Sequence, residues 1–150
     1  MTRHRTLQPD PRDLLGNVVE AVLEAGALLH AEFHRPDGPR RTSSSKTPVD
    51  DQVERHLRRR LQALHGCGWH GEELPRAWRG DGDLWVVDPQ DGTSPFLRGR
   101  RGSAVSAALV RERVPVLGVV YVLRPIGFSP EVLECAPGAG QRIAAELTIW

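Results

Sequence analysis

The chain has 150 residues, 39% of them hydrophobic, so it suits one domain with a buried core and is not a disordered chain. Lysine and arginine number 20 against 19 acidic residues, and this net charge of +1 gives no overall field that favours a nucleic acid or a membrane surface. No apolar run of signal-peptide length follows the basic start, and none approaches the roughly 20 residues that span a bilayer, which predicts a cytoplasmic protein.

Two helices are predicted in the first half of the chain. From about Asp13 to Phe33, apolar residues recur at three- and four-residue steps, and residues 1–12 before them are expected to be flexible. The predicted buried positions of this helix are Leu14, Leu15, Val18, Val19, Val22, Leu23, Ala27 and Leu28. After a loop rich in proline, glycine and serine, a second helix should run from Pro48 to about Leu64. Its buried residues are spaced by four, at Val49, Val53, Leu57 and Leu61.

The second half is predicted to be a sheet. Residues 84–87 form a short apolar run typical of a buried strand, with a loop directly after it. Residues 104–110 and 116–122 are rich in β-formers and are joined by residues 111–115, which predicts a hairpin with a slightly long turn. Beyond Tyr121, proline and glycine interrupt every candidate element, so residues 124–150 form a divergent or truncated end. Helices followed by strands predict an α+β fold, a helix pair packed on a mainly antiparallel sheet.

Two other features are assigned no function. The basic run at His56 and residues 58–60 is typical of a solvated helix face. Cys67 and Cys135 lie far apart without a Cys or His at metal-ligand spacing, so we expect half-buried thiols rather than a disulfide or a zinc site. A nucleic-acid-binding module built on the arginines is disfavoured, because aromatic residues for base stacking are few.

Acidic residues occur in three clusters. Asp88 and Asp91 follow the predicted strand, and between them Pro89 restrains the backbone, so that both acids and the Gln90 carbonyl could turn toward one point. The other clusters are Glu72 with Glu73 and Asp50 with Asp51. Adjacent carboxylates raise each other's pKa unless a cation neutralises them, so convergence of these clusters would favour Mg2+. Taken singly, each cluster could instead be a turn or a solvated loop.

The same segments resemble the inositol monophosphatase family. Residues 85–93 read WVVDPQDGT and are followed by Phe96, which is similar to the family signature W-(hydrophobic)2-D-P-x-D-G-T-x-x-F. Residues 47–54, TPVDDQVE, resemble the family's T-x-x-D-x-x-x-E, and residues 71–73 match its G-E-E. Residues 104–106 and 115–121 are similar to two of its strands. The resemblance implies that residues 13–123 form the metal-binding N-terminal domain, one half of the layered α/β sugar-phosphatase fold.

The resemblance also implies an activity, the hydrolysis of a small phosphorylated metabolite by a metal-activated water. The substrate could be an inositol phosphate, a 3'-phosphoadenosine nucleotide or a sugar phosphate. Family members use two or three Mg2+ ions, with Mn2+ as an alternative ion and Li+ as an inhibitor. One Mg2+ would be held by Glu72, Asp88 and the Gln90 carbonyl, and Asp88 and Asp91 would share a second.

Catalytic and phosphate-binding residues are implied by the same match. Thr93 and Asp50 would orient and deprotonate the attacking water, and Glu72 would act with them through the metal. The amides of Gly92 and Thr93 would face the substrate phosphate.

The chain also departs from the family. No Trp-Asp pair occurs in it, although a W-D motif in the family's second half completes the metal site. Lys46 lies too close to Thr47 to match the family's upstream lysine, and Arg40 or Arg41 occupies the expected region. A catalytically impaired, truncated homologue that keeps metal binding, or acts as an interaction module, is therefore the alternative. Because a half-fold should leave one sheet face uncovered, we also expect a homodimer.

Overall fold

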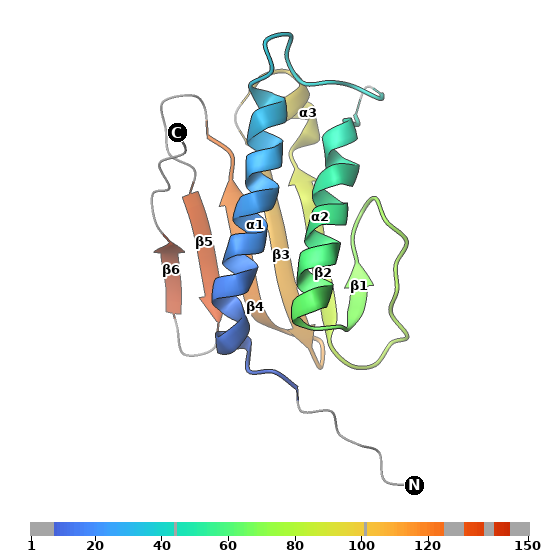
Figure 1. The fold of residues 1–150 in the computed structure, drawn as a ribbon, viewed down its shortest axis with the longest axis vertical. Coiled ribbons are helices and arrows are strands. Elements are labelled where there is room, and N and C mark those ends of the chain that lie inside the picture. The colour runs from blue at the N-terminus through green and yellow to red at the C-terminus, as the bar shows by residue number, and fades with distance from the viewer. Residues whose placement is uncertain (1–7, 44, 101, 125–130, 137–139, 145–150) are drawn as a thin grey trace, which may run out of the picture.

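The computed structural model describes residues 8–43, 45–100, 102–124, 131–136 and 140–144. Two long helices, α1 (Pro11–Phe33) and α2 (Pro48–Leu64), pack side by side on one face of a six-stranded sheet (Figure 1). The strands are β1 (Gly68–His70), β2 (Leu84–Asp91), β3 (Ala104–Arg111), β4 (Val114–Val122), β5 (Glu131–Ala136) and β6 (Gly140–Ala144), with the short helix α3 (Thr93–Leu97) after β2. They lie in sequence order, and only the β1–β2 pair is parallel. The predicted α+β fold with a mainly antiparallel sheet is confirmed.

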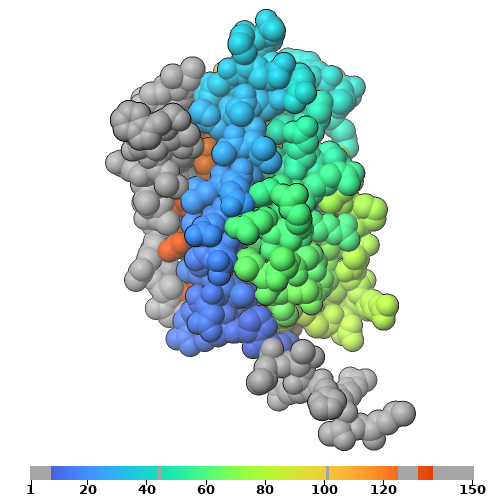
Figure 2. All heavy atoms as spheres, in the orientation of Figure 1, coloured from blue at the N-terminus to red at the C-terminus, as the bar shows by residue number. Residues whose placement is uncertain are grey.

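Helix α1 begins two residues earlier than predicted. The Asp10 side chain caps it by accepting from the Arg12 amide, and Pro11 suits the first turn because the amide that proline lacks would be unpaired there. Residues 1–7 of the segment expected to be flexible lie outside the described residues. The outer surfaces of α1 (blue) and α2 (green) form one continuous layer in Figure 2.

The predicted buried stripe of α1 is right at its start and wrong at its end. Leu14, Val18 and Val22 are buried, but Ala27 and Leu28 are exposed, because a 3.6-residue turn moves the stripe onto Ala21, Ala25, Gly26 and Leu29. A Cβ at Gly26 would collide with the ring of Tyr121, so glycine allows the helix to lie close to β4. Contrary to expectation, α1 is long and apolar enough to cross a membrane, although a helix packed on a core passes the same test. The cytoplasmic location stays a prediction.

Helix α2 has the predicted bounds. The Thr47 side chain accepts from the Val49 amide while the Asp50 side chain accepts from the Thr47 amide, which makes a capping box, and Pro48 occupies the first turn. All four predicted inner residues, Val49, Val53, Leu57 and Leu61, are fully buried. The local capping signals and the four-residue spacing therefore agree with the tertiary packing.

The strands differ from the prediction in three ways. β2 does not end at Val87 but continues through Asp91. The β3–β4 turn is shorter than expected, since Arg111 pairs with Val114 and only Glu112 and Arg113 lie between them, both with positive φ. This two-residue turn with left-handed residues matches the twist of a hairpin. β5 and β6 are two further antiparallel strands, in a segment for which no element is predicted.

The sheet has two unlike faces. Trp85, Val105, Leu109, Val119 and Tyr121 point toward α1 and α2 and are fully buried. The alternate residues form what we term the open sheet face, and no helix of the described residues packs across it. Its half-exposed apolar or small members are Val86, Ala104, Ser106, Ala108, Val110, Val116, Gly118, Val120, Val122 and Leu133, and Asp88 lies on the same face opposite Ser106. Cys135, on the same face, is exposed rather than half-buried, whereas Cys67 is half-buried as expected.

Candidate metal and phosphate site

Three chain segments bring the acidic clusters to one end of the sheet. β1 and β2 are parallel, so Glu72, just after β1, and Asp88, near the end of β2, lie at the same edge. Asp50 lies in the first turn of α2, which begins at this end (Figure 1). Glu72 lies close enough to both Asp50 and Asp88 for its charge to raise the pKa of each.

A bulge shapes the end of β2. Asp88 pairs with Ser106 and Asp91 pairs with Ala104, so three steps along β2 match two along β3. The extra residue turns the Gln90 amide toward the Asp88 carboxylate, which accepts from it at 2.9 Å. The predicted loop after Val87 is therefore a bulged strand end that carries both acids.

Gly92 and Thr93 fix the turn from this bulge into α3. Gly92 has a φ of 79°, and a Cβ there would collide with the Gly102 carbonyl, so any other residue would be strained. The Ser103 hydroxyl donates to the Gly92 carbonyl at 3.0 Å, and the Thr93 hydroxyl donates to the Gln90 carbonyl at 3.2 Å. The predicted phosphate-binding residues thus lie directly beside a predicted metal ligand.

Glu54 holds the loop that carries Glu72. Its carboxyl group is fully buried and accepts from the Trp69 indole at 3.1 Å, the Glu73 amide at 2.5 Å and the Leu74 amide at 3.1 Å. A Cβ at Gly71 would overlap this carboxyl group, so glycine is required for the close approach. The sequence prediction gave Glu54 no role. Its four-residue spacing from Asp50, which puts both on one helix face, was the available signal.

The site is electrostatically unfavourable for its own carboxylates. Burial, together with the charges of Glu72 and Asp91 and against the bond from the Gln90 amide, raises the pKa of Asp88 to about 6. Burial likewise raises the pKa of Asp50 to about 6, with Glu73 and Glu72 adding to the rise, while the Thr47 amide and the Lys46 charge oppose it. Like charges in a half-buried site favour binding of a cation or a proton.

The donor set fits a hard divalent cation. Within the described residues, no three His, Cys, Asp or Glu side chains are close enough to form a metal site by themselves. Oδ1 of Asp50, however, is buried without a hydrogen-bond partner, and the Gln90 carbonyl adds a neutral oxygen beside Asp88. Mg2+ normally keeps several waters and takes only one or two carboxylates from the protein, so the residues fit Mg2+.

The raised pKa values predict how the stability of the metal-free protein depends on pH. Between about pH 4 and pH 6 the unfolded chain ionises Asp88 while the folded chain keeps it protonated, so the free energy of unfolding falls as the pH rises and stays low above this window. A pKa shift of one unit corresponds to about 1.4 kcal/mol. With a reduction for partial exposure, we expect the ionisation of Asp88 to lower the free energy of unfolding by about 1 to 2 kcal/mol across this window.

Urea unfolding in EDTA of the unsubstituted protein and of Asp88→Asn, at about pH 4.5 and about pH 7.5, measures this effect. Asp88→Asn should become more stable relative to the unsubstituted protein at the higher pH only. A difference that does not change with pH would contradict the assignment.

Other predicted contacts do not form as direct bonds. The Thr93 hydroxyl is bonded to the Gln90 carbonyl and Asp50 Oδ2 to the Thr47 amide, so no hydrogen bond joins Thr93 to Asp50. Arg40 forms a bidentate ion pair with Glu32 on α1, and Arg41 donates to the Leu97 carbonyl. Neither arginine bonds to the acidic site. Lys46 does bond there, and the sequence prediction missed it.

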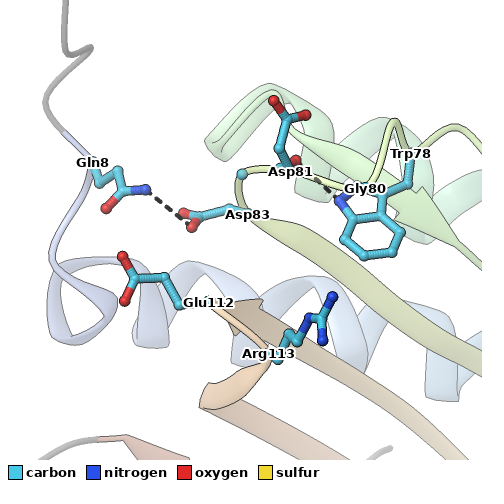
Figure 3. A pocket seen from close by; sticks show the side chains of 8 residues that line it. Gln8, Trp78, Gly80, Asp81, Asp83, Glu112 and Arg113 are labelled. Atoms are coloured by element: carbon cyan, nitrogen blue, oxygen red, sulfur yellow. Dashed lines mark hydrogen bonds between the residues drawn. The ribbon is translucent and has the colours of Figure 1, made fainter.

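A separate pocket lies at the opposite end of β2, around Asp83 (Figure 3). It has a volume of about 460 Å3, and Gln8, Trp78 and Arg113 are among its lining residues. Asp83 is buried and accepts from Gln8, from His65 at 2.8 Å and from Arg111 at 2.8 Å. Burial opposes the charge of Asp83, but the bonds from Arg111 and His65 lower its pKa overall. These contacts tie the N-terminal segment, α2 and the hairpin together, and so have a structural role.

Comparison with known proteins decides the family. Residues 10–143 match a model described as the inositol monophosphatase family. The chain belongs to the inositol monophosphatase family. This match includes the three acidic segments and extends beyond residue 123, into β5 and β6.

Individual relatives agree with the family match. The chain is 32% identical over 117 residues to inositol-1-monophosphatase ImpA of Mycolicibacterium smegmatis, covering 75% of this chain and 42% of that protein. It is 30% identical over 120 residues to the 3'(2'),5'-bisphosphate nucleotidase CysQ of Aggregatibacter actinomycetemcomitans, covering 72% and 43%. The structure of SuhB from Mycobacterium tuberculosis superposes with a TM-score of 0.71 at 28% identity, covering 93% of this chain and 50% of that one. The chain thus spans half or less of the length of these relatives.

Proposed function

We propose that the chain carries the metal- and phosphate-binding half of a Mg2+-dependent phosphomonoesterase for a small phosphorylated metabolite. What supports this proposal is the position of Glu72 between Asp50 and Asp88 at one end of the sheet, where its charge raises the pKa of both aspartates. The relatives' names give an inositol monophosphate and a 3'(2'),5'-bisphosphate nucleotide, so an inositol phosphate, a 3'-phosphoadenosine nucleotide and a sugar phosphate are the candidate substrates. Mn2+ would be an alternative ion and Li+ an inhibitor.

The proposed metal ligands are oxygen donors. Glu72, Asp88 and the Gln90 carbonyl would hold one Mg2+, and Asp88 with Asp91 a second. When bound, Mg2+ supplies a lowered pKa for a coordinated water and charge neutralisation for the phosphate. Glu72 and Asp91 are exposed, so they can adjust to an ion, whereas the bulge fixes Asp88 and Gln90.

The chain's own residues would manage the proton and the phosphate. The unpartnered Oδ1 of Asp50 can accept a proton from an attacking water, and a carboxylate with a pKa of about 6 is suited to general-base work near neutral pH. Thr93 would orient the same water by its hydroxyl, which the Gln90 carbonyl positions. The Gly92 and Thr93 amides would face the phosphate oxygens in a turn whose shape Gly92 fixes.

Removing the proposed bridging ligand should weaken metal binding. We expect Asp88→Asn to lower the affinity for Mn2+ or Mg2+ by at least about 10-fold, because the amide has no charge and Asp88 would contact both ions. Asp51→Asn is the matched control, because Asp51 forms an exposed ion pair with Arg55 on the outer side of α2. Isothermal calorimetry measures both variants. Equal effects would show that Asp88 is not the bridging ligand.

Phosphate release from a panel of phosphomonoesters, with Mg2+ and with EDTA, tests the activity itself. Mg2+-dependent release that Asp88→Asn abolishes would support the proposal. The second candidate is a catalytically impaired homologue, favoured because no three His, Cys, Asp or Glu side chains of the described residues are close enough to form a metal site by themselves. Metal binding without turnover on the whole panel would support that candidate instead.

A further inference from the structure

Lys46 is the sole lysine of the chain, in which every other basic residue except histidine is arginine. Its ammonium group lies 3.0 Å and 3.3 Å from the two carboxylate oxygens of Glu73, at the edge of the acidic site. Both partners are anchored through their backbones, since the Lys46 carbonyl accepts from Thr42 and the Glu73 amide donates to Glu54. The ion pair therefore has a defined place beside the proposed metal ligands.

The charge of Lys46 reaches beyond its direct partner. Asp50 and Glu72 both interact electrostatically with the ammonium group, although neither bonds to it. The neighbouring arginines have other partners, because Arg40 pairs with Glu32 and Arg55 with Asp51. The Lys46 side chain is 58% exposed, so its ammonium group can move within the site mouth.

We propose that Lys46 is a built-in counter-ion of the acidic site, which offsets its negative charge and thereby weakens its affinity for divalent cations. The inference rests on the proposed function, because it concerns the same metal site. A divalent ion bound beside Glu72 and Asp88 would lie near the positive charge of Lys46. Repulsion between the ion and the ammonium group would oppose binding. The effect comes from the positive charge, which the ammonium group carries on a flexible stem.

The main test compares Mn2+ affinity by calorimetry in variants of Lys46. Lys46→Met, which keeps the length and removes the charge, should tighten Mn2+ binding by about 3- to 10-fold at low salt, and the gain should shrink at about 0.5 M KCl. Lys46→Arg is the matched control that keeps the charge, and its affinity should stay within about 2-fold of the unsubstituted protein. Unchanged or weaker binding in Lys46→Met would overturn the inference.

The single lysine allows a second measurement that does not depend on activity. Reductive methylation with a 13C label keeps the charge and gives one lysine resonance, separate from that of the terminal amine. Titration with Mg2+ should shift this resonance with the same midpoint as calorimetry carried out with Mg2+, and Asp88→Asn should abolish the shift.

The two results separate the inference from the function on which it rests. If Asp88-dependent Mg2+ binding occurs while the lysine resonance stays fixed and Lys46→Met binds normally, the inference fails and the metal site stands. If no saturable binding that depends on Asp88 occurs, the proposed site fails and the inference fails with it.

Discussion

Replacement of Glu54 with alanine is expected to lower the free energy of unfolding by about 4 kcal/mol and to weaken metal binding at the same time. Three buried or half-buried donors, on Trp69, Glu73 and Leu74, would lose their common acceptor. A buried donor without a partner costs about 1 to 3 kcal/mol, and the removed carboxyl group would also leave a cavity. The loop that presents Glu72 would then be free to move away from Asp88.

Urea unfolding with a matched control separates this effect from a general cost of removing glutamate. Glu20→Ala makes the same change on an exposed helix position, where the nearest cation, on Arg60, is 3.9 Å away, so it should cost less than about 0.5 kcal/mol. Glu54→Gln should lower the free energy of unfolding by an amount between those of Glu54→Ala and Glu20→Ala. The glutamine oxygen can still accept from some of the three donors, but its NH2 group would face another donor and cannot accept from it. A loss below about 1 kcal/mol in Glu54→Ala would show that these bonds do not hold the loop.

The positions of the proposed site residues in the helices and strands could be predicted because their signals are local. Residues 85–93 contain a strand, two acids and the flexible Gly92, and residues 47–50 contain a complete helix cap. Each segment determines its own shape, so Asp50 at a helix start and Asp88 at a strand end could be placed without tertiary information. The approach of Glu72 to Asp88 needed only that β1 and β2 be parallel neighbours, whereas Asp50 reaches this end through the packing of α2 on β2.

Other features depend on contacts that no local pattern contains. Glu54 gains its role from donors 15 to 20 residues away, on and after β1, which is itself only three residues long. Lys46 meets Glu73 across 27 positions, so its place at the site followed from no spacing rule. Ala25 and Leu29 face the core because the helical period is 3.6 residues over the 23 residues of α1. The predicted stripe used alternating steps of three and four residues and missed them.

The open sheet face is expected to make the isolated chain self-associate. Four strands about 4.8 Å apart and about 20 Å long form a face of roughly 400 Å2. At about 25 cal/mol per Å2, covering this face would contribute about 10 kcal/mol of hydrophobic free energy, which the uncovered chain lacks. Its ten half-exposed apolar or small residues are uncharged, and Asp88 and Glu131 pair with Ser106 and Val122 at one end of the face. Ala104, Ser106, Ala108 and Gly118 are small. Two such faces can therefore pack against each other as sheets do.

The size of this face also sets how strong the association should be. Two copies packed face to face would cover about 800 Å2 in total, which is below the usual size of a stable interface, so we expect a reversible dimer at micromolar concentration. Sedimentation velocity from about 1 to 50 µM should show the transition. Leu133→Lys places a charge on the face and should leave a monomer, whereas Leu28→Lys, on the exposed side of α1, should still dimerise. A compact monomer at every concentration, with a cooperative melt, would contradict this prediction. It would mean that the core between the helices and the sheet stabilises the chain even though the open sheet face is exposed to water.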